Sequence, residues 1–120
     1  MIKVVTLLNR KPGMTRQAFI EYYESQHRLI GEKYPGGYAV KYQRRYLQPI
    51  ADDDEGTAEL PCDVLMEIWF PDRTTTDRAM ASLATDEAQA EIVADEERVF
   101  DRALICSYVV EEYESDMDAL

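Results

Sequence analysis

The distribution of apolar and polar positions predicts alternating strands and helices along the chain. Residues 2–8 (IKVVTLL) are β-branched and apolar on both faces, which is typical of a buried strand. The turn sequence NRKPG follows, and Thr15 is placed to cap a helix. We expect this helix to run to about Tyr34, because the sequence Pro-Gly-Gly follows it directly.

Two further strands are predicted in the middle of the chain. Residues 38–47 (YAVKYQRRYL) alternate in the manner of a strand, and residues 63–70 (DVLMEIWF) form another that Pro71 ends. Between them, a charged loop is expected from about Gln48 to Asp63. This loop is too polar to pack in a core.

The last third of the chain predicts a helix and a final strand. TTTDRAMASLA begins a second helix, with Asp72 or one of the threonines as its cap. DEAQAEIVADEERVF extends the helix, and a break is expected near Thr85. ALICSYVVEEY, residues 103–113, is the fourth strand.

The resulting order, βαββαβ, predicts an α+β fold of the ferredoxin-like type. In this fold an antiparallel sheet carries two helices on one face. With 120 residues, the chain is expected to form a single domain spanning residues 1–120.

Three of the predicted strands are apolar on both faces, although the two helices can cover only one. The third strand shows this clearly. One of its faces carries Val64, Met66, Ile68 and Phe70, and the other carries Leu65 and Trp69. A second copy of the chain is the simplest cover for the other face. The sequence therefore predicts a homodimer, a dimeric α+β barrel.

The composition restricts the possible partners and the location. Acidic residues outnumber basic ones 24 to 13, and a formal net charge of −11 argues against nucleic acid and anionic membrane surfaces as partners. The acidic runs are expected to be solvated. No apolar run approaches the ~20 residues of a membrane helix, and no secretory signal is evident. We expect a soluble, cytoplasmic protein.

No cofactor or metal is expected. Cys62 and Cys106 lack the spacing of a paired motif, and together with one histidine they do not make a zinc set. The sequence also has no phosphate loop, no dinucleotide fingerprint and no nucleophile elbow.

His27, the only histidine, is the first candidate for chemistry. It lies on a helical stripe formed by Ile20, Tyr23, His27, Ile30 and Tyr34. Two interpretations stay open: a buried histidine hydrogen-bonded to a backbone carbonyl, or an imidazole that lines a cleft between helix and sheet. An imidazole exchanges protons near neutral pH. Tyr23, one turn earlier, either orients it or donates a hydrogen bond to a substrate oxygen.

The strand over 38–47 and its neighbour supply candidate ligand contacts. Tyrosines and one arginine share a face of the strand over 38–47. They could bind an aromatic ligand that carries an oxyanion, or they could form a structural row of tyrosines packed across neighbouring strands. Glu67 and Trp69 share a face of the third strand, and Glu67 either pairs with an arginine or faces a cavity. The candidate ligand contacts are Tyr22, Tyr42, Arg44, Tyr46 and Trp69.

The segment KPGMTRQAFIEYYESQHRLIGEKYPG resembles the EthD-like family of the dimeric α+β barrel superfamily. The resemblance rests on Lys11-Pro12-Gly13, on Tyr22 and Tyr23 shortly before His27, and on VKYQRRYLQP. It extends over about residues 2–112, although the family often has tryptophan at the aromatic position. It implies a ferredoxin-like homodimer with a cleft in each subunit, and it favours a functional role for His27.

The resemblance implies several functions, because the superfamily includes cofactor-free cyclases, dehydratases, isomerases, small monooxygenases and non-catalytic accessory proteins. Our first hypothesis is a cofactor-independent lyase or isomerase acting on a small aromatic or enolisable carbonyl compound, with His27 and Tyr23 as catalytic residues. A cofactor-free monooxygenase and a ligand-binding accessory protein of a degradation or biosynthetic pathway are the alternatives.

Overall fold

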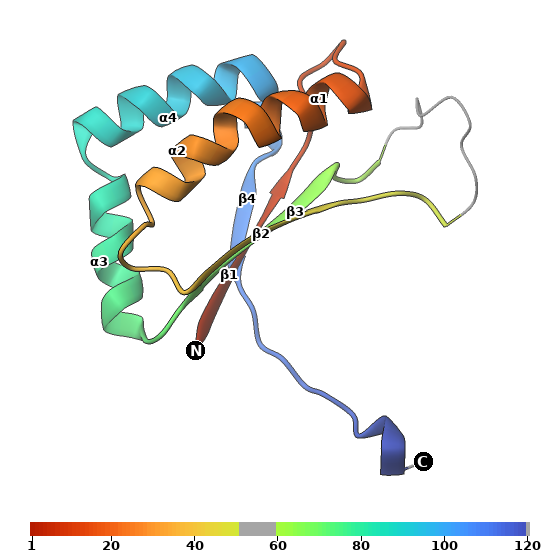
Figure 1. The fold of residues 1–120 in the computed structure, drawn as a ribbon, viewed down its shortest axis with the longest axis vertical. Coiled ribbons are helices and arrows are strands. Elements are labelled where there is room, and N and C mark those ends of the chain that lie inside the picture. The colour runs from red at the N-terminus through yellow and green to blue at the C-terminus, as the bar shows by residue number, and fades with distance from the viewer. Residues whose placement is uncertain (51–59, 120) are drawn as a thin grey trace.

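The structure, a computed structural model, describes residues 1–50 and 60–119 (Figure 1). The middle of the predicted loop between Gln48 and Asp63, including its DDDE run, lies outside the described residues.

Four antiparallel strands form one sheet in the order β2-β3-β1-β4. Their bounds are β1 (Ile2–Leu8), β2 (Lys41–Tyr46), β3 (Val64–Phe70) and β4 (Cys106–Val109). Figure 1 shows the helices gathered on one side of this sheet. The predicted βαββαβ order and the ferredoxin-like fold are confirmed.

The first helical run departs from a regular α-helix at its centre. Thr15 caps it as predicted, since its side chain accepts a hydrogen bond from the backbone N–H of Ala18 at 3.2 Å. The run then consists of α1 (Arg16–Tyr22), a π-helical turn (Tyr23–His27) and α2 (Arg28–Lys33). Sequence periodicity cannot distinguish such a widened turn from an α-helix. π-Helical turns are often found at functional sites.

Strand β2 begins three residues later than predicted. After α2, the backbone N–H groups of Tyr38 and Ala39 both donate to the carbonyl of Pro35. This turn holds Tyr38 outside the sheet, so the strand starts at Lys41.

The second helical run is broken where the sequence predicted. Helix α3 (Arg73–Leu83) is capped by Asp72, and α4 (Asp86–Val99) is capped by Thr85. Each cap side chain accepts a hydrogen bond from a backbone N–H three residues ahead.

Strand β4 is shorter than the predicted 103–113. A 3₁₀ turn, Arg102–Leu104, precedes it, and its ladder with β1 ends at the Val4–Val109 pair. Figure 1 shows the C-terminal segment leading away from the sheet.

The core fills the space between the helices and one face of the sheet. Phe19 and Tyr23 are fully buried there, against Leu8, Val64 and Phe100. A second cluster joins β3 to α3 through Ile68, Phe70 and Ala79. Burying these side chains supplies most of the stabilisation of such a layer.

In the described part of the chain, no helix covers the other face of the sheet (Figure 1). Trp69 lies there between two lysines, with the ammonium of Lys3 3.9 Å and that of Lys41 4.3 Å from its ring centroid. Glu67 lies on the same face and forms an ion pair with Arg45 at 2.6 Å. The sequence left open whether Glu67 pairs with an arginine or faces a cavity, and the structure shows the arginine pair.

Among the described residues, no helix is long and apolar enough to span a bilayer. Both cysteines are free thiols, with Cys62 buried and Cys106 exposed.

Candidate functional site

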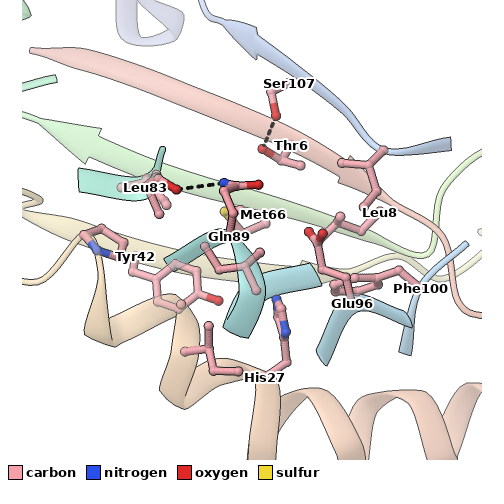
Figure 2. Close-up of a pocket in the computed structure, with 16 residues that line it drawn as sticks. Thr6, Leu8, His27, Tyr42, Met66, Leu83, Gln89, Glu96, Phe100 and Ser107 are labelled. Carbon is pink, nitrogen blue, oxygen red and sulfur yellow. Dashed lines mark hydrogen bonds between the residues drawn. The ribbon is translucent and has the colours of Figure 1, made fainter. Parts of the chain in front are cut away.

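A cavity of about 330 Å³ lies between the helices and the covered face of the sheet (Figure 2). This volume is at the lower end of the ~300–1,000 Å³ typical of small-molecule sites. Its walls are mainly apolar, formed by side chains such as Leu8, Ile30, Met66, Ile68, Ile92 and Phe100. The polar side chains that line it are Thr6, His27, Tyr42, Gln89, Glu96 and Ser107.

His27 lies at the end of the π-helical turn and lines this cavity. Its ring is nearly buried, with edge-to-face contacts to Tyr23 at 5.2 Å and Phe100 at 4.9 Å between ring centroids. Its Nδ1 atom lies 2.8 Å from Oδ2 of Asp95 on α4. A carboxylate can only accept hydrogen bonds, so this contact places the proton on Nδ1 and leaves Nε2 for the cavity.

Asp95 is itself held in place. It is only 6% exposed, and its second oxygen accepts a 2.6 Å hydrogen bond from the hydroxyl of Tyr22. The guanidinium of Arg98 lies 4.0 Å from the same oxygen. Burial and the neighbouring carboxylate raise the pKa of the Tyr22 phenol, so it remains a donor. Tyr22 thus contacts Asp95, although the sequence had placed it among the ligand contacts.

Tyr42, predicted as a ligand contact, lines the cavity, whereas Tyr23, predicted as a catalytic residue, does not. Tyr23 is fully buried in the core, and its hydroxyl lies 3.0 Å from that of Tyr42. Tyr42 is the member of the pair that lines the cavity, and Figure 2 shows its hydroxyl directed toward the side where His27 lies. Tyr23 differs from the prediction because its ring packs in the core, against Phe19 one turn earlier and Phe100.

Other polar groups occur on the remaining walls. The hydroxyls of Thr6 and Ser107 lie 2.8 Å apart on the sheet, across the cavity from His27 (Figure 2). The amide of Gln89 donates to the carbonyl of Leu83 at 2.7 Å. Glu96 on α4 also lines the cavity, and its carboxylate accepts a hydrogen bond from Nε of Arg102 at 3.4 Å.

Arg44 and Tyr46 share the helix-facing side of β2 with Tyr42, but both bind Glu24. The guanidinium donates to the two carboxylate oxygens at 3.0 and 2.6 Å, and the Tyr46 hydroxyl donates at 2.5 Å. Hydrogen bonding from Arg44 lowers the pKa of Glu24, and burial raises that of Tyr46. These two predicted ligand contacts form a structural cluster beside the cavity. Trp69, the remaining predicted contact, lies on the opposite face of the sheet.

Residues 11–103 match the family described as the EthD domain. The chain belongs to the EthD domain family. The sequence resemblance to this family is therefore confirmed over most of the chain. No curated protein matches this EthD-domain protein in sequence.

Solved structures share the fold of this EthD-domain protein. An EthD-family protein of Bacillus halodurans is 22% identical, with a TM-score of 0.60 over 94% of this chain and 100% of the other. An antibiotic biosynthesis monooxygenase is 15% identical, with a TM-score of 0.53 over 95% and 100%. A dimeric protein of unknown function with a ferredoxin-like fold, from Bacteroides fragilis, is 9% identical, with a TM-score of 0.53 over 91% of each chain. Identities this low establish the fold alone.

Asp95 is the site residue that sequence reasoning missed in this EthD-domain protein. It lies in an acidic run that was expected to be solvated, so nothing distinguished it from its charged neighbours. A signal was present, because Asp95 shares a helical stripe with Ala88, Ile92 and Val99. An acidic residue on an otherwise apolar stripe requires a partner within the fold.

Within residues 1–50 and 60–119, no group of three or more His, Cys, Asp or Glu side chains is arranged to hold a metal ion.

Proposed function

We propose that this EthD-domain protein is a cofactor-independent lyase or isomerase in which His27 transfers protons on a small carbonyl compound. The arrangement of His27 supports this function most directly. One ring nitrogen is fixed by a buried carboxylate at 2.8 Å, and the ring lines an apolar cavity. Orientation of an imidazole by a carboxylate is a recurring device of general acid–base catalysis.

The lining of the cavity favours an uncharged ligand. Among the described residues, the lining includes the carboxylate of Glu96 but no lysine or arginine. The guanidinium of Arg102 binds Glu96 but is not part of the lining, so an anionic ligand would bury its charge beside a carboxylate, which is costly. The formal net charge of −11 would also repel it. A neutral aldehyde, ketone or hydroxy-ketone fits this environment better than a carboxylate or phosphate ester.

The proposed reaction begins with proton abstraction from the carbon next to the carbonyl. The Nε2 atom of His27 accepts this proton, and the C–H electron pair moves into an enolate. Asp95 stabilises the imidazolium that forms. The proton then returns to a different carbon in an isomerisation, or to a departing hydroxyl, which leaves as water, in a dehydration. A positioned acid–base group of this kind contributes ~10²- to 10⁴-fold to the rate.

Deuterium exchange tests this proposal with simple carbonyl compounds in place of the natural substrate. Cyclohexanone, acetophenone and 4-hydroxy-2-butanone would be incubated with the protein in D₂O, and loss of the α-proton signals would be followed by NMR. We expect catalysed exchange for at least one compound, and no catalysis by His27→Asn. Exchange that never exceeds the protein-free rate would contradict proton transfer at carbon. If a compound bound without exchanging, a non-catalytic accessory role would be favoured.

Similarity to an antibiotic biosynthesis monooxygenase supports a second candidate, a cofactor-free oxygenase. The only tryptophan, Trp69, lies on the opposite face of the sheet from the cavity, so it does not supply an aromatic group to this site. An oxygen electrode separates the candidates, because only the oxygenase consumes O₂ during turnover.

We also infer that two copies of the chain pair through the sheet face that the helices leave uncovered. This face carries the apolar side chains of Val5, Leu7, Leu65 and Trp69, which are half-buried in the single chain. Apolar side chains on a sheet face that no helix covers call for a second layer, and a second copy of the chain would supply it. Similarity to a dimeric ferredoxin-like protein supports the same arrangement. A two-fold axis would bring identical faces together.

A further inference from the structure

Gly31 occupies an unusual position in the wall of the cavity. It lies inside helix α2, where glycine costs ~1 kcal/mol relative to alanine. A Cβ atom built at this position would lie 2.4 Å from the hydroxyl oxygen of Tyr42 and 2.7 Å from its Cζ. Any side chain at position 31 would therefore displace the Tyr42 ring. The missing side chain makes room for the phenol at the cavity wall.

The Tyr42 hydroxyl also has a defined partner on its inner side. Tyr23 is fully buried, and its hydroxyl lies 3.0 Å from the Tyr42 oxygen. Burial raises the pKa of Tyr23 well above its ordinary value, so this phenol keeps its proton. Burial also raises the pKa of Tyr42, whereas the hydrogen bond from Tyr23 lowers it. The geometry allows either hydroxyl to donate, and when Tyr23 donates, the proton of Tyr42 is available to the cavity.

We propose that Tyr42 is the hydrogen-bond donor to the ligand's carbonyl oxygen, and that Gly31 and Tyr23 are the residues that position it. The inference rests on the proposed function, since it concerns the same cavity and a ligand oxygen that becomes negative when His27 removes a proton. Donors fixed in advance stabilise such an oxyanion because they need no reorganisation during the reaction.

The inference extends to ligand specificity. Tyr42 and His27 lie on neighbouring walls, whereas the Thr6–Ser107 hydroxyl pair lies across the cavity (Figure 2). A ligand would therefore place its reacting carbonyl between Tyr42 and His27, and its apolar body would lie against the other walls. Compounds that present an oxygen to Tyr42 should bind more tightly than isosteres that lack it.

A pair of isosteric probes tests the inference. 4-Nitrophenol carries an oxygen that mimics an enolate, and 4-nitrotoluene has a methyl group in its place. Calorimetric titration gives the Kd of each, and their ratio measures discrimination in favour of the hydroxyl. Because both probes have nearly the same shape, the ratio does not change when a variant merely narrows or loosens the cavity.

We expect the wild-type ratio to favour 4-nitrophenol about tenfold or more, since hydrogen bonds to charged oxygens are strong. Tyr42→Phe and Gly31→Ala should both abolish this preference, and Tyr23→Phe should weaken it about two- to fivefold. Tyr34→Phe is the matched control, because its hydroxyl donates to Glu91 outside the cavity lining. Melting curves identify any variant that fails to fold, and Tyr42→Phe and Tyr23→Phe each delete only one oxygen.

The outcomes separate this inference from the proposed function. A wild-type protein without preference for 4-nitrophenol, or a Tyr42→Phe variant that retains it, would overturn the assignment of Tyr42. Free 4-nitrophenol is already partly ionised in neutral water, so the absorbance that reports on proton removal by His27 is the additional phenolate absorbance gained when the probe binds. Loss of that absorbance in His27→Asn, with the hydroxyl preference intact, would support both assignments. A Tyr42-dependent preference without any phenolate signal would support the donor and count against His27 as the base.

Discussion

His27 and Asp95 lie 68 residues apart in the chain, yet Nδ1 of the imidazole is 2.8 Å from Oδ2 of the carboxylate. The contact joins the first helical run to α4, and both residues are nearly buried. It fixes the tautomer of the ring and gives Nε2 a defined direction. A buried carboxylate with two hydrogen-bond donors is costly to disturb, so the pair also contributes to the packing of the two helices.

Replacing His27 with asparagine should remove proton transfer and preserve the fold. The asparagine amide can still donate to Asp95, but it has no counterpart of Nε2. We expect the deuterium-exchange rate to fall at least ~10²-fold while the melting temperature changes little. His27→Ala is the comparison, because it leaves Asp95 without this donor and should cost ~1–3 kcal/mol of stability. Equal exchange rates for His27→Asn and the wild type would exclude His27 from the mechanism.

Asp95→Asn should impair the same reaction through the orientation of the ring. An asparagine amide can donate to Nδ1, which would place the ring proton on Nε2 and leave the cavity without a base. We expect a loss of ~10²-fold or more in the exchange rate, and ¹⁵N NMR of the imidazole should report the altered tautomer. Glu91→Gln is the matched control, since it removes one charge from the same helix at a residue bonded to Lys33 and Tyr34. An Asp95→Asn variant with the wild-type tautomer and rate would contradict this role.

The uncovered sheet face should be the dimer interface. Leu65 lies on this face, so Leu65→Glu would bury a charge there, and we expect it to shift sedimentation from dimer to monomer. Leu29→Glu changes a leucine that is 52% exposed on the first helical run, and it should remain dimeric. Wild-type protein that sediments as a compact monomer at micromolar concentration would refute the homodimer.

The cluster of Glu24, Arg44 and Tyr46 should stabilise the fold at neutral pH but not at acidic pH. Hydrogen bonding from Arg44 lowers the pKa of Glu24 below its ordinary 4.5. The contribution is therefore fully present above the ordinary value and is lost as pH falls through the lowered one. Glu24→Gln should reduce stability at pH 7 by up to ~1 kcal/mol, a modest amount because the side chain is 37% exposed. The difference should shrink in melting curves taken toward pH 3.

The same substitution made in the Arg44→Met variant tests whether Arg44 causes the pH-dependent loss of stability. If Arg44 is responsible, Glu24→Gln should have little effect on stability in Arg44→Met, since the two substitutions remove the same interaction. A stability difference between Glu24→Gln and wild type that stays constant from pH 7 to pH 3 would show that the carboxylate charge does not contribute.

The sequence by itself determined the elements and their order. Thr15, Asp72 and Thr85 act as helix caps through contacts within three residues, so their roles could be identified from local chemistry. Two-residue alternation along β2 and β3 also assigned side chains to the correct faces, because the strand geometry fixes it. The match of residues 11–103 to the EthD family agrees with the motif around His27.

Only the tertiary structure decided which side chains meet at the cavity. The sequence does not identify Asp95 as the partner of His27, because the contact depends on how α4 packs across the first helical run. Tyr23 is buried in the core, and the cavity wall is formed instead by Tyr42, a residue of a strand. Such choices depend on long-range packing, as at Gly31, where the absent side chain leaves room for the Tyr42 hydroxyl.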